Sequence, residues 1–76
     1  MGYRGTVDGE AMPLELTQRE REVLLLLARG LTYDEIGRLL EVSINTVRTH
    51  VRGVYAKLGV GNKTEAAIAG LRLGLI

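Results

Sequence analysis

Residues 32–51 read TYDEIGRLLEVSINTVRTHV, and two helix starts within this stretch decide the fold. Thr32 followed by Glu35 is a capping-box pattern, in which the hydroxyl accepts from the N3 amide and the acid accepts from the cap amide. Ser43 is a favourable N-cap residue for a second helix. Because only residues 41–43 separate the two helices, they must cross steeply. We therefore predict a helix-turn-helix over about residues 32–51.

The apolar residues of this stretch are spaced to meet where the two helices cross. Ile36 and Leu40 lie one helical turn apart on the first helix, and Val47 and Val51 do the same on the second. Gly37 would let the helices approach closely, although glycine inside a helix costs roughly 0.5–1 kcal/mol relative to alanine. The pattern indicates a tightly packed crossing.

Two further helices flank this motif. Thr17 with Glu20 and Asn62 with Glu65 repeat the capping-box pattern, and glycines at positions 30, 59 and 74 stand where helices would end. No segment alternates with the period of a strand. We expect an all-α, four-helix bundle-like domain with a central helix-turn-helix, its helices spanning residues 18–29, 33–41, 44–58 and 63–73.

Composition limits the domain organisation and the kinds of site. Residues 1–13 hold the only proline and no apolar period, so we expect a flexible linker or an expression-vector remnant there, with one domain over residues 14–76. The absence of cysteine, with a single histidine, argues against disulfides and metal sites and favours a cytoplasmic protein. The longest apolar run, residues 23–28, is too short to span a membrane.

The net charge of +1 conceals an uneven distribution of charged residues. Residues 1–41 contain five basic and eight acidic side chains. Residues 42–64 contain no acid and four bases, which are Arg48, Arg52, Lys57 and Lys63. A basic stretch without acids favours a surface that faces an anion.

The helix predicted over residues 44–58 has an apolar side and a side made of hydrogen-bonding groups. At about 100° per residue, the latter lies opposite Val47. Arginine can bind guanine O6 and N7, asparagine can pair with adenine, and a threonine methyl can meet thymine. We therefore predict contacts with DNA bases or the major groove from Asn45, Arg48, Thr49 and Arg52, and phosphate contacts from Thr46 and Lys57 at one flank.

The sequence offers nothing that predicts an enzyme. His50, the only histidine, has no second catalytic group placed beside it, and no glycine-rich phosphate loop is present. We expect no catalytic residue and no cofactor.

The chain resembles the LuxR-type (GerE-type) DNA-binding domain, also found at the C-terminus of NarL/FixJ response regulators. The matching text is LTQREREVL at 16–24, ARGL at 28–31, TVRTH at 46–50 and KLGV at 57–60. The resemblance implies a regulator domain, the C-terminal effector of a response regulator or ligand-sensing regulator, whose third helix enters the major groove. It also implies a homodimer on double-stranded DNA and RNA polymerase as a partner.

The resemblance also implies roles for single residues. Arg48, Thr49 and Arg52 occupy positions that usually touch bases or adjacent phosphates, and Thr32, Thr46 and Lys63 occupy positions near the DNA backbone. The sequence departs from the family pattern at Asp34, where lysine is common, at Gly37, where alanine is usual, and at Lys63, where arginine is usual.

The last predicted helix is apolar on two sides. We expect Thr64, Ala67, Ile68, Leu71 and Leu75 to face the core. The other side would form a dimer interface, which is also the role that the resemblance implies for this helix. Its residues are Ala66, Ala69, Gly70 and Leu73.

Two alternatives remain open at this point. A promoter-reading fourth region of a sigma factor shares the LTxREREVL opening and the TVR segment, although the KLGVG turn at 57–61 and the apolar last helix argue against it. A helical protein-interaction module would use the last helix as its main site and would show no salt-dependent affinity for DNA.

Overall fold

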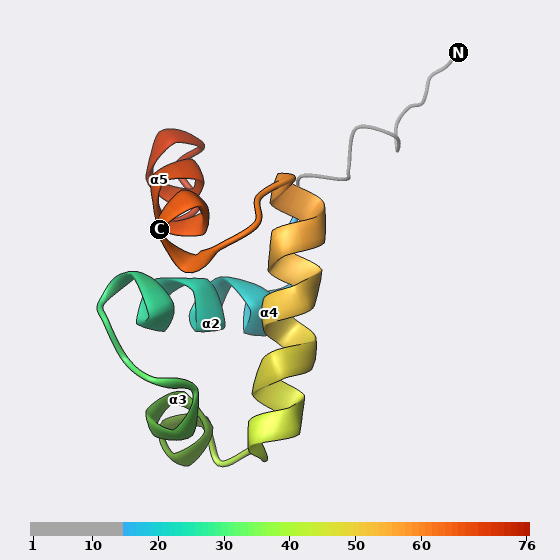
Figure 1. The fold of residues 1–76 in the computed structure, drawn as a ribbon, viewed down its shortest axis with the longest axis vertical. Helices are drawn as coiled ribbons and strands as arrows, with labels where there is room; N and C mark the ends of the chain where they lie inside the picture. Colours follow the sequence, from blue (N-terminus) through green and yellow to red (C-terminus); the bar gives the residue numbers. More distant parts are fainter. Residues whose placement is uncertain (1–14) are drawn as a thin grey trace.

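The computed structural model describes residues 15–76, and this part of the chain contains four α-helices and no strand (Figure 1). The all-α prediction is confirmed, and each predicted helix agrees with the structure to within one residue at its C-terminal end. Residues 1–13, for which we predicted a linker, lie outside the described residues. The helices are α2 (Gln18–Ala28), α3 (Tyr33–Leu40), α4 (Ile44–Leu58) and α5 (Lys63–Arg72).

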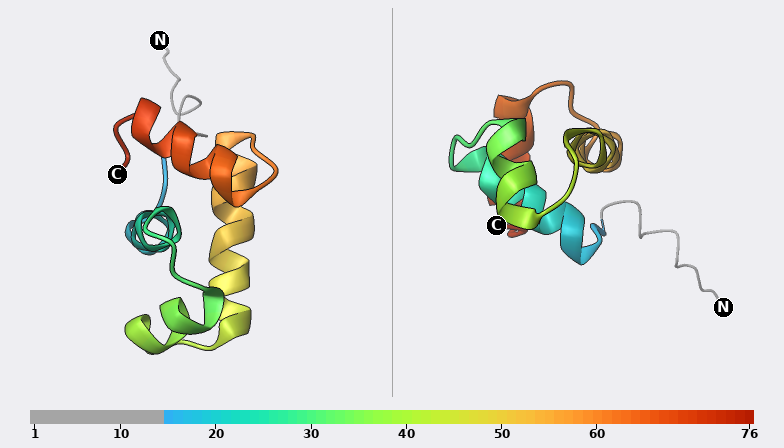
Figure 2. Two further views of the ribbon diagram at one scale, coloured as in Figure 1. Left: turned by 60° about the vertical axis from the view of Figure 1, so that its left-hand side comes forward. Right: turned by 90° about the horizontal axis from the view of Figure 1, so that it is seen from below.

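The longest helix, α4, forms one side of the domain, and the other three helices stack along it. Figures 1 and 2 show α3 beside the start of α4, α5 near its end, and α2 between them. The middle helix α2 contacts each of the other three, whereas α3 and α5 do not contact each other within residues 15–76. The position of α4 therefore depends on α2 as well as on α3.

The helix starts form as their capping residues predict. The amide of Glu20 donates to Thr17 Oγ1 at 3.1 Å, and Glu20 Oε1 accepts from the Thr17 amide at 2.9 Å. Thr32 and Glu35 form the same pair of bonds, at 3.1 and 2.8 Å. Ser43 Oγ accepts from the N3 amide of α4 at 3.1 Å. The two capping boxes and the Ser43 cap are confirmed.

The start of α5 differs from its prediction. Asn62 Oδ1 accepts from the Glu65 amide at 2.9 Å, as expected, but Glu65 Oε1 accepts from the amide of Gly61 at 2.9 Å. The backbone of Asn62 is more extended than that of the two threonine caps, with φ of −156° against −67° and −78°. The acid therefore binds the amide one residue earlier, and the predicted reciprocal box at Asn62 is wrong.

Two groups of buried apolar side chains hold the helices together. The first joins α2, α3 and α4, and it consists of Val23, Leu27, Ile36, Val47 and Val51. The second joins α2, α4 and α5 with the segment before α2, and it consists of Leu16, Leu24, Val54 and Ala66. The residues predicted to meet at the helix crossing all belong to the first group or pack against it.

The turn between α3 and α4 requires a close approach and an unusual backbone conformation. The amide of Val42 donates to the carbonyl oxygen of Gly37 at 2.9 Å. A Cβ added at Gly37 would lie 2.9 Å from the carbonyl oxygen of Val42, which confirms that this position favours a small residue. Glu41 ends α3 in the left-handed region, with φ 61° and ψ 45°, a conformation that costs an L-residue roughly 1–2 kcal/mol.

The burial of α5 differs from the prediction at several residues, although Leu75 packs against the second buried group as predicted. Ala66 and Gly70 are buried, whereas Ile68 and Leu71 are 51% and 67% exposed. A Cβ added at Gly70 would lie 3.0 Å from Leu24 Cδ2, so the small residues let α5 pack closely against α2. The prediction that Ala66 and Gly70 lie at a dimer interface is therefore wrong. The prediction that Ile68 and Leu71 face the core is also wrong, and so is that for Thr64, which is exposed.

The core assignment predicts unequal effects for two apolar residues of α3. Ile36 is fully buried, so Ile36→Ala should lower the free energy of unfolding by about 2–5 kcal/mol. Leu39 is 61% exposed, so Leu39→Ala should change it by no more than about 0.5 kcal/mol. Urea denaturation followed by circular dichroism measures both changes. Equal losses would contradict the core described here.

Candidate nucleic-acid interface

The four residues predicted to contact bases lie together on one exposed side of α4. Its opposite side holds Val47, Val51 and Val54, which are buried against α2, α3 and α5. Burial of these valines fixes the rotation of α4 about its own axis. The helix consequently turns a strip without acidic residues toward solvent, formed by Asn45, Arg48, Thr49 and Arg52. We call these four residues the α4 strip.

Hydrogen bonds within α4 organise this strip. Arg48 Nη1 donates to Asn45 Oδ1 at 3.3 Å, one helical turn away. The Thr49 hydroxyl donates to the backbone carbonyl of Asn45 at 3.1 Å, which fixes the direction of its methyl group. All of these groups are exposed, so a partner can reach them.

The structure places the residues predicted to contact phosphates at separate points. Thr32 is exposed at the N-cap of α3. Thr46 is half-buried at the start of α4, with its Oγ1 3.0 Å from Ser43 Oγ. Lys63 is the exposed first residue of α5, near the end of α4 that is distant from α3 (Figure 1). Thr32 thus caps α3, and Thr46 lies in the first turn of α4, where its amide donates to the capping residue Ser43.

Lys57 is held by a carboxylate of the domain itself. Its Nζ lies 2.7 Å from Glu20 Oε1, and the Glu20 side chain is only 11% exposed. A Cβ at Gly53 would overlap Oε2 of Glu20, so glycine there admits the carboxylate between α2 and α4. The structure therefore gives Lys57 a partner that the spacing along the sequence did not indicate. The Lys57 ammonium is occupied by Glu20 and is less available to a phosphate than an exposed lysine would be.

The pKa of the Glu20 carboxyl reflects opposing influences. Burial by itself raises this pKa, but the hydrogen bond and positive charge of Lys57 and the hydrogen bonds from Thr17 lower it. The net result is a pKa below the ordinary value of 4.5, so the ionised form is favoured in the folded domain. The interaction therefore stabilises the junction of α2 with α4 at neutral pH.

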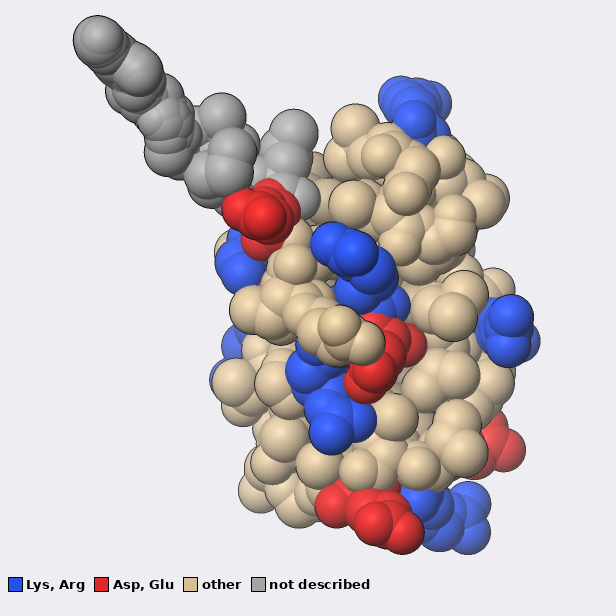
Figure 3. All heavy atoms as spheres, turned by 180° about the vertical axis from the view of Figure 1, so that it is seen from behind, with Lys and Arg blue, Asp and Glu red and all other residues tan. Residues whose placement is uncertain are grey.

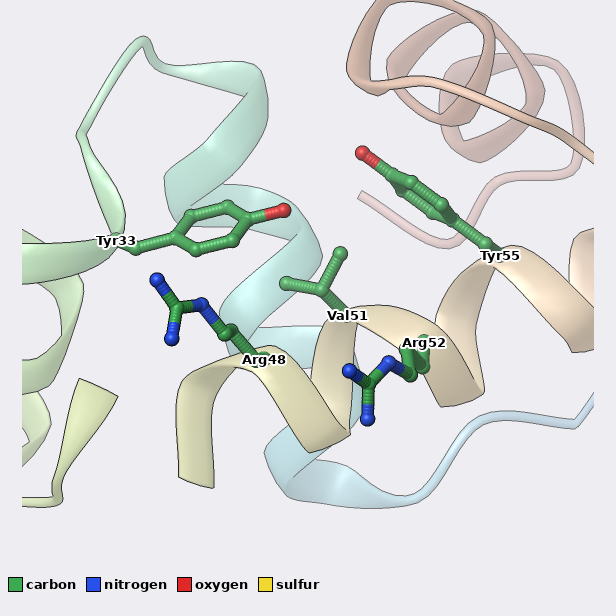
Figure 4. A pocket seen from close by; sticks show the side chains of 5 residues that line it. All are labelled: Tyr33, Arg48, Val51, Arg52 and Tyr55. Atoms are coloured by element: carbon green, nitrogen blue, oxygen red, sulfur yellow. The ribbon is translucent and has the colours of Figure 1, made fainter. Parts of the chain in front are cut away.

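A hollow of about 220 Å³ lies between α3 and α4, at the edge of the α4 strip. Figure 4 shows the side chains that line it, with the hydroxyls of Tyr33 and Tyr55 pointing toward each other and the Arg48 guanidinium beside the Tyr33 ring. Burial and the neighbouring Tyr33 phenol raise the pKa of Tyr55. The other lining residues are Val51 and Arg52.

Tyr33 was not predicted to be a functional residue. The helical pattern placed Tyr55 at the border of the apolar side of α4, beside Arg48, which was the only available signal for this hollow. The position of Tyr33 depends on the steep crossing of α3 over α4, which periodicity along one helix does not reveal.

Charges of both signs occur together elsewhere on the surface of the domain. Figure 3 shows basic and acidic side chains interspersed on the face behind the view of Figure 1. Exposed ion pairs join Arg19 to Glu22 at 3.2 Å and Arg38 to Asp34 at 3.1 Å. These pairs differ from the α4 strip, which contains no acid, so the strip is the better candidate for binding an anion.

Residues 15–76 contain neither a candidate metal site nor a candidate membrane span. No group of three or more His, Cys, Asp or Glu side chains is placed to hold a metal ion there. None of the four helices is both long and apolar enough to cross a membrane.

Comparison with known proteins identifies the family. The sequence profile described as "Bacterial regulatory proteins, luxR family" matches residues 14–69. The chain belongs to this family. The resemblance inferred from the sequence is thereby confirmed, and this luxR-family domain is a DNA-binding regulator domain rather than an enzyme.

Curated relatives of the luxR-family domain are regulators about three times as long as this chain. It is 45% identical over 67 residues to the transcriptional regulatory protein LiaR of Bacillus subtilis, covering 87% of this chain and 32% of LiaR. It is 43% identical over 61 residues to the response regulator protein VraR of Staphylococcus aureus, covering 80% of this chain and 29% of VraR. The chain therefore spans about a third of the length of these relatives.

Two solved structures share the fold of this luxR-family domain. The structure of the transcription factor GerE aligns with a TM-score of 0.74 and 42% identity, covering 79% of this chain and 90% of GerE. The response regulator ChrA of a heme-sensing two-component system aligns with a TM-score of 0.78 and 35% identity, covering 96% of this chain and 41% of ChrA. The four-helix arrangement is therefore that of the family.

The lowered pKa of Glu20 predicts a pH dependence of stability. As the pH falls, the unfolded chain binds this proton first, at its ordinary pKa of 4.5. The stabilisation is thus present above pH 4.5 and is lost as the pH falls through the lower pKa of the folded state. Urea denaturation should show that the free energy of unfolding of the wild type declines more steeply with acid than that of Glu20→Gln.

A matched variant on the same helix separates this interaction from the general effect of acid. Glu22 forms an ion pair with Arg19 at the surface, with its side chain 40% exposed. Glu22→Gln should therefore keep the pH dependence of the wild type, since exposed pairs contribute little. Parallel curves for Glu20→Gln and the wild type would contradict the role given to Glu20.

Proposed function

We propose that this luxR-family domain binds double-stranded DNA sequence-specifically, with α4 in the major groove. The observation that carries the proposal is the exposed α4 strip on a helix of 15 residues. An α-helix fits the major groove, where each base pair presents a distinct pattern of donors and acceptors. Support comes also from the helix-turn-helix geometry, because α3 and its turn leave this side of α4 uncovered.

The side chains of the interface divide into two groups by chemistry. Within the strip, Arg48 and Arg52 can bind guanine, Asn45 can bind adenine, and the Thr49 methyl can contact thymine. The proposed phosphate contacts are Thr32, Thr46 and Lys63, whose hydroxyl and ammonium groups are suited to the DNA backbone. Base contacts would determine sequence preference, and the phosphate contacts would set the position on the duplex.

We further propose that the chain is the C-terminal, DNA-binding portion of a longer cytoplasmic regulator that acts together with RNA polymerase. Support comes from relatives that are about three times as long as this chain. One of them is the transcriptional repressor ThaA of Burkholderia thailandensis, which is 39% identical and of which the chain covers 29%. A sensory or receiver part would then control when the domain engages its operator.

The exposed apolar side of α5 supports pairing of two copies on DNA. Ile68 and Leu71 are more than half exposed, and Leu73 is 46% exposed at the end of the helix. Adjacent exposed apolar residues on a small domain are typical of a protein interface. We propose that this side, with the half-buried Ala69 at its border, contacts the same side of a second copy.

Binding to duplex DNA across a salt series tests the main proposal. The logarithm of the association constant should fall linearly with the logarithm of salt concentration, with a slope of about −0.9 per phosphate contact. A site selected from a random pool should lose about 1–3 kcal/mol with Arg52→Ala, and an unrelated duplex should lose less. Arg29→Ala, an exposed arginine at the end of α2, should change neither.

Two outcomes would overturn this proposal. An affinity independent of salt would instead favour a protein-interaction module. Equal losses for Arg52→Ala and Arg29→Ala would show that α4 does not read the site.

Sedimentation with a two-half-site duplex tests the pairing. Leu71→Glu should weaken binding to the two-half-site duplex at least tenfold, because a charge would be placed in the apolar contact. Binding to a single half-site should not change. Leu39→Glu is a matched control on α3, since Leu39 is similarly exposed at 61%. Equal cooperativity for Leu71→Glu and the wild type would remove this side of α5 as the interface.

A further inference from the structure

The hollow between α3 and α4 opens at the α4 strip and shares Arg48 and Arg52 with it. It is lined by Tyr33 from α3 and by Arg48, Val51, Arg52 and Tyr55 from α4 (Figure 4). These five residues include two phenol donors and two guanidinium groups but no acid. Such a set of donors is suited to an anion.

The hollow lies at one flank of α4. With Val47 as the reference and about 100° per residue, Tyr55 and Arg48 lie at about 80° and 100°, toward α3. Asn45 lies at about 160° and Thr49 at about 200°, in the middle of the exposed side. The tyrosines therefore border the strip rather than belong to it.

The dimensions of DNA place an anion at this flank. The major groove is about 12 Å wide, and an α-helix with its side chains is about 10–12 Å across. A helix in the groove therefore has a sugar-phosphate strand along each flank. The hollow of about 220 Å³ is open at this border and can receive the oxygens of one phosphate group.

We propose that this hollow binds a backbone phosphate of the DNA, with the hydroxyls of Tyr33 and Tyr55 as donors and Arg48 as the neutralising charge. This inference rests on the proposed function, because it assumes that α4 enters the major groove. A tyrosine hydroxyl is protonated at neutral pH, and both phenols are therefore available as donors. In Figure 4 the two hydroxyls point toward each other, so both can reach one acceptor.

The proposal assigns a sequence-independent role to two tyrosines. A phosphate is present at every step of the duplex, so this contact would strengthen binding to any sequence equally. It would also assign Arg48 to the backbone rather than to guanine, so that Asn45, Thr49 and Arg52 remain for the bases.

Hydroxyl removal tests the proposal with little change in shape. Tyr33→Phe and Tyr55→Phe should each weaken binding of the whole chain about tenfold, by the same factor for a selected site and an unrelated duplex. Thr64→Val, which removes an exposed hydroxyl from α5, is the matched control and should change neither affinity. Circular dichroism and thermal unfolding show whether each variant folds like the wild type.

Neutral methylphosphonate groups placed singly along the duplex locate the contact. At one backbone position per half-site, this replacement should weaken the wild type about tenfold and leave Tyr33→Phe and Tyr55→Phe without further loss. Scanning the wild type alone is informative even if a variant does not fold. Absence of any such position beside the groove overturns the proposal.

The remaining outcomes are also distinct. If Tyr33→Phe and Tyr55→Phe bind DNA like the wild type, the proposed phosphate site is overturned. The two rings would then serve only to pack around Arg48. A loss confined to the selected site overturns it as well, because it assigns the hydroxyls to base reading. If the wild type itself binds neither duplex with salt dependence, the proposed function fails, whatever the tyrosines do.

Discussion

The short turn between α3 and α4 is the constraint on which the rest of the domain depends. After this three-residue turn, α4 crosses α3 steeply and continues past it, where it packs against α2 and α5. The crossing is close because Gly37 has no side chain to collide with the carbonyl of Val42. Glu41 completes the turn in a left-handed conformation. Without this geometry, the side of α4 that carries the arginines would be covered by a neighbouring helix.

The second support of α4 is α2, which lies between the other helices and packs on all of them. Its apolar side supplies buried residues to both core groups. At its N-terminal end the Glu20 carboxylate accepts from the Thr17 amide and pairs with Lys57 near the end of α4. Removing one member of such a partly buried pair leaves the other uncompensated, so the pair matters more for holding α4 in place than an exposed pair would.

Local chemistry made much of this structure predictable. Capping residues fix helix starts through bonds that span only three positions, so Thr17, Thr32 and Ser43 could be interpreted from the sequence alone. The apolar period of α4 likewise predicted which side would be exposed, including Arg48 and Arg52. In these cases the interacting groups are neighbours along the chain.

Features that depend on distant parts of the chain were missed. The last helix is apolar on two sides, and only its packing against α2 shows that Ala66 and Gly70, rather than the larger side chains, face inward. The small residues face inward because they allow α5 and α2 to approach each other closely. The Glu20–Lys57 pair and the Tyr33–Tyr55 hollow join residues far apart in sequence, so no pattern within one helix could indicate them.

The division of α4 into a buried valine side and an exposed polar side has a consequence for how such regulators diversify. Residues that hold the domain together and residues proposed to contact DNA share a helix but occupy separate sides of it. Substitutions among the exposed residues leave the buried contacts intact, and surface changes of this kind usually alter stability by less than about 0.5 kcal/mol. Operator preference can therefore drift, or be engineered, on an unchanged scaffold.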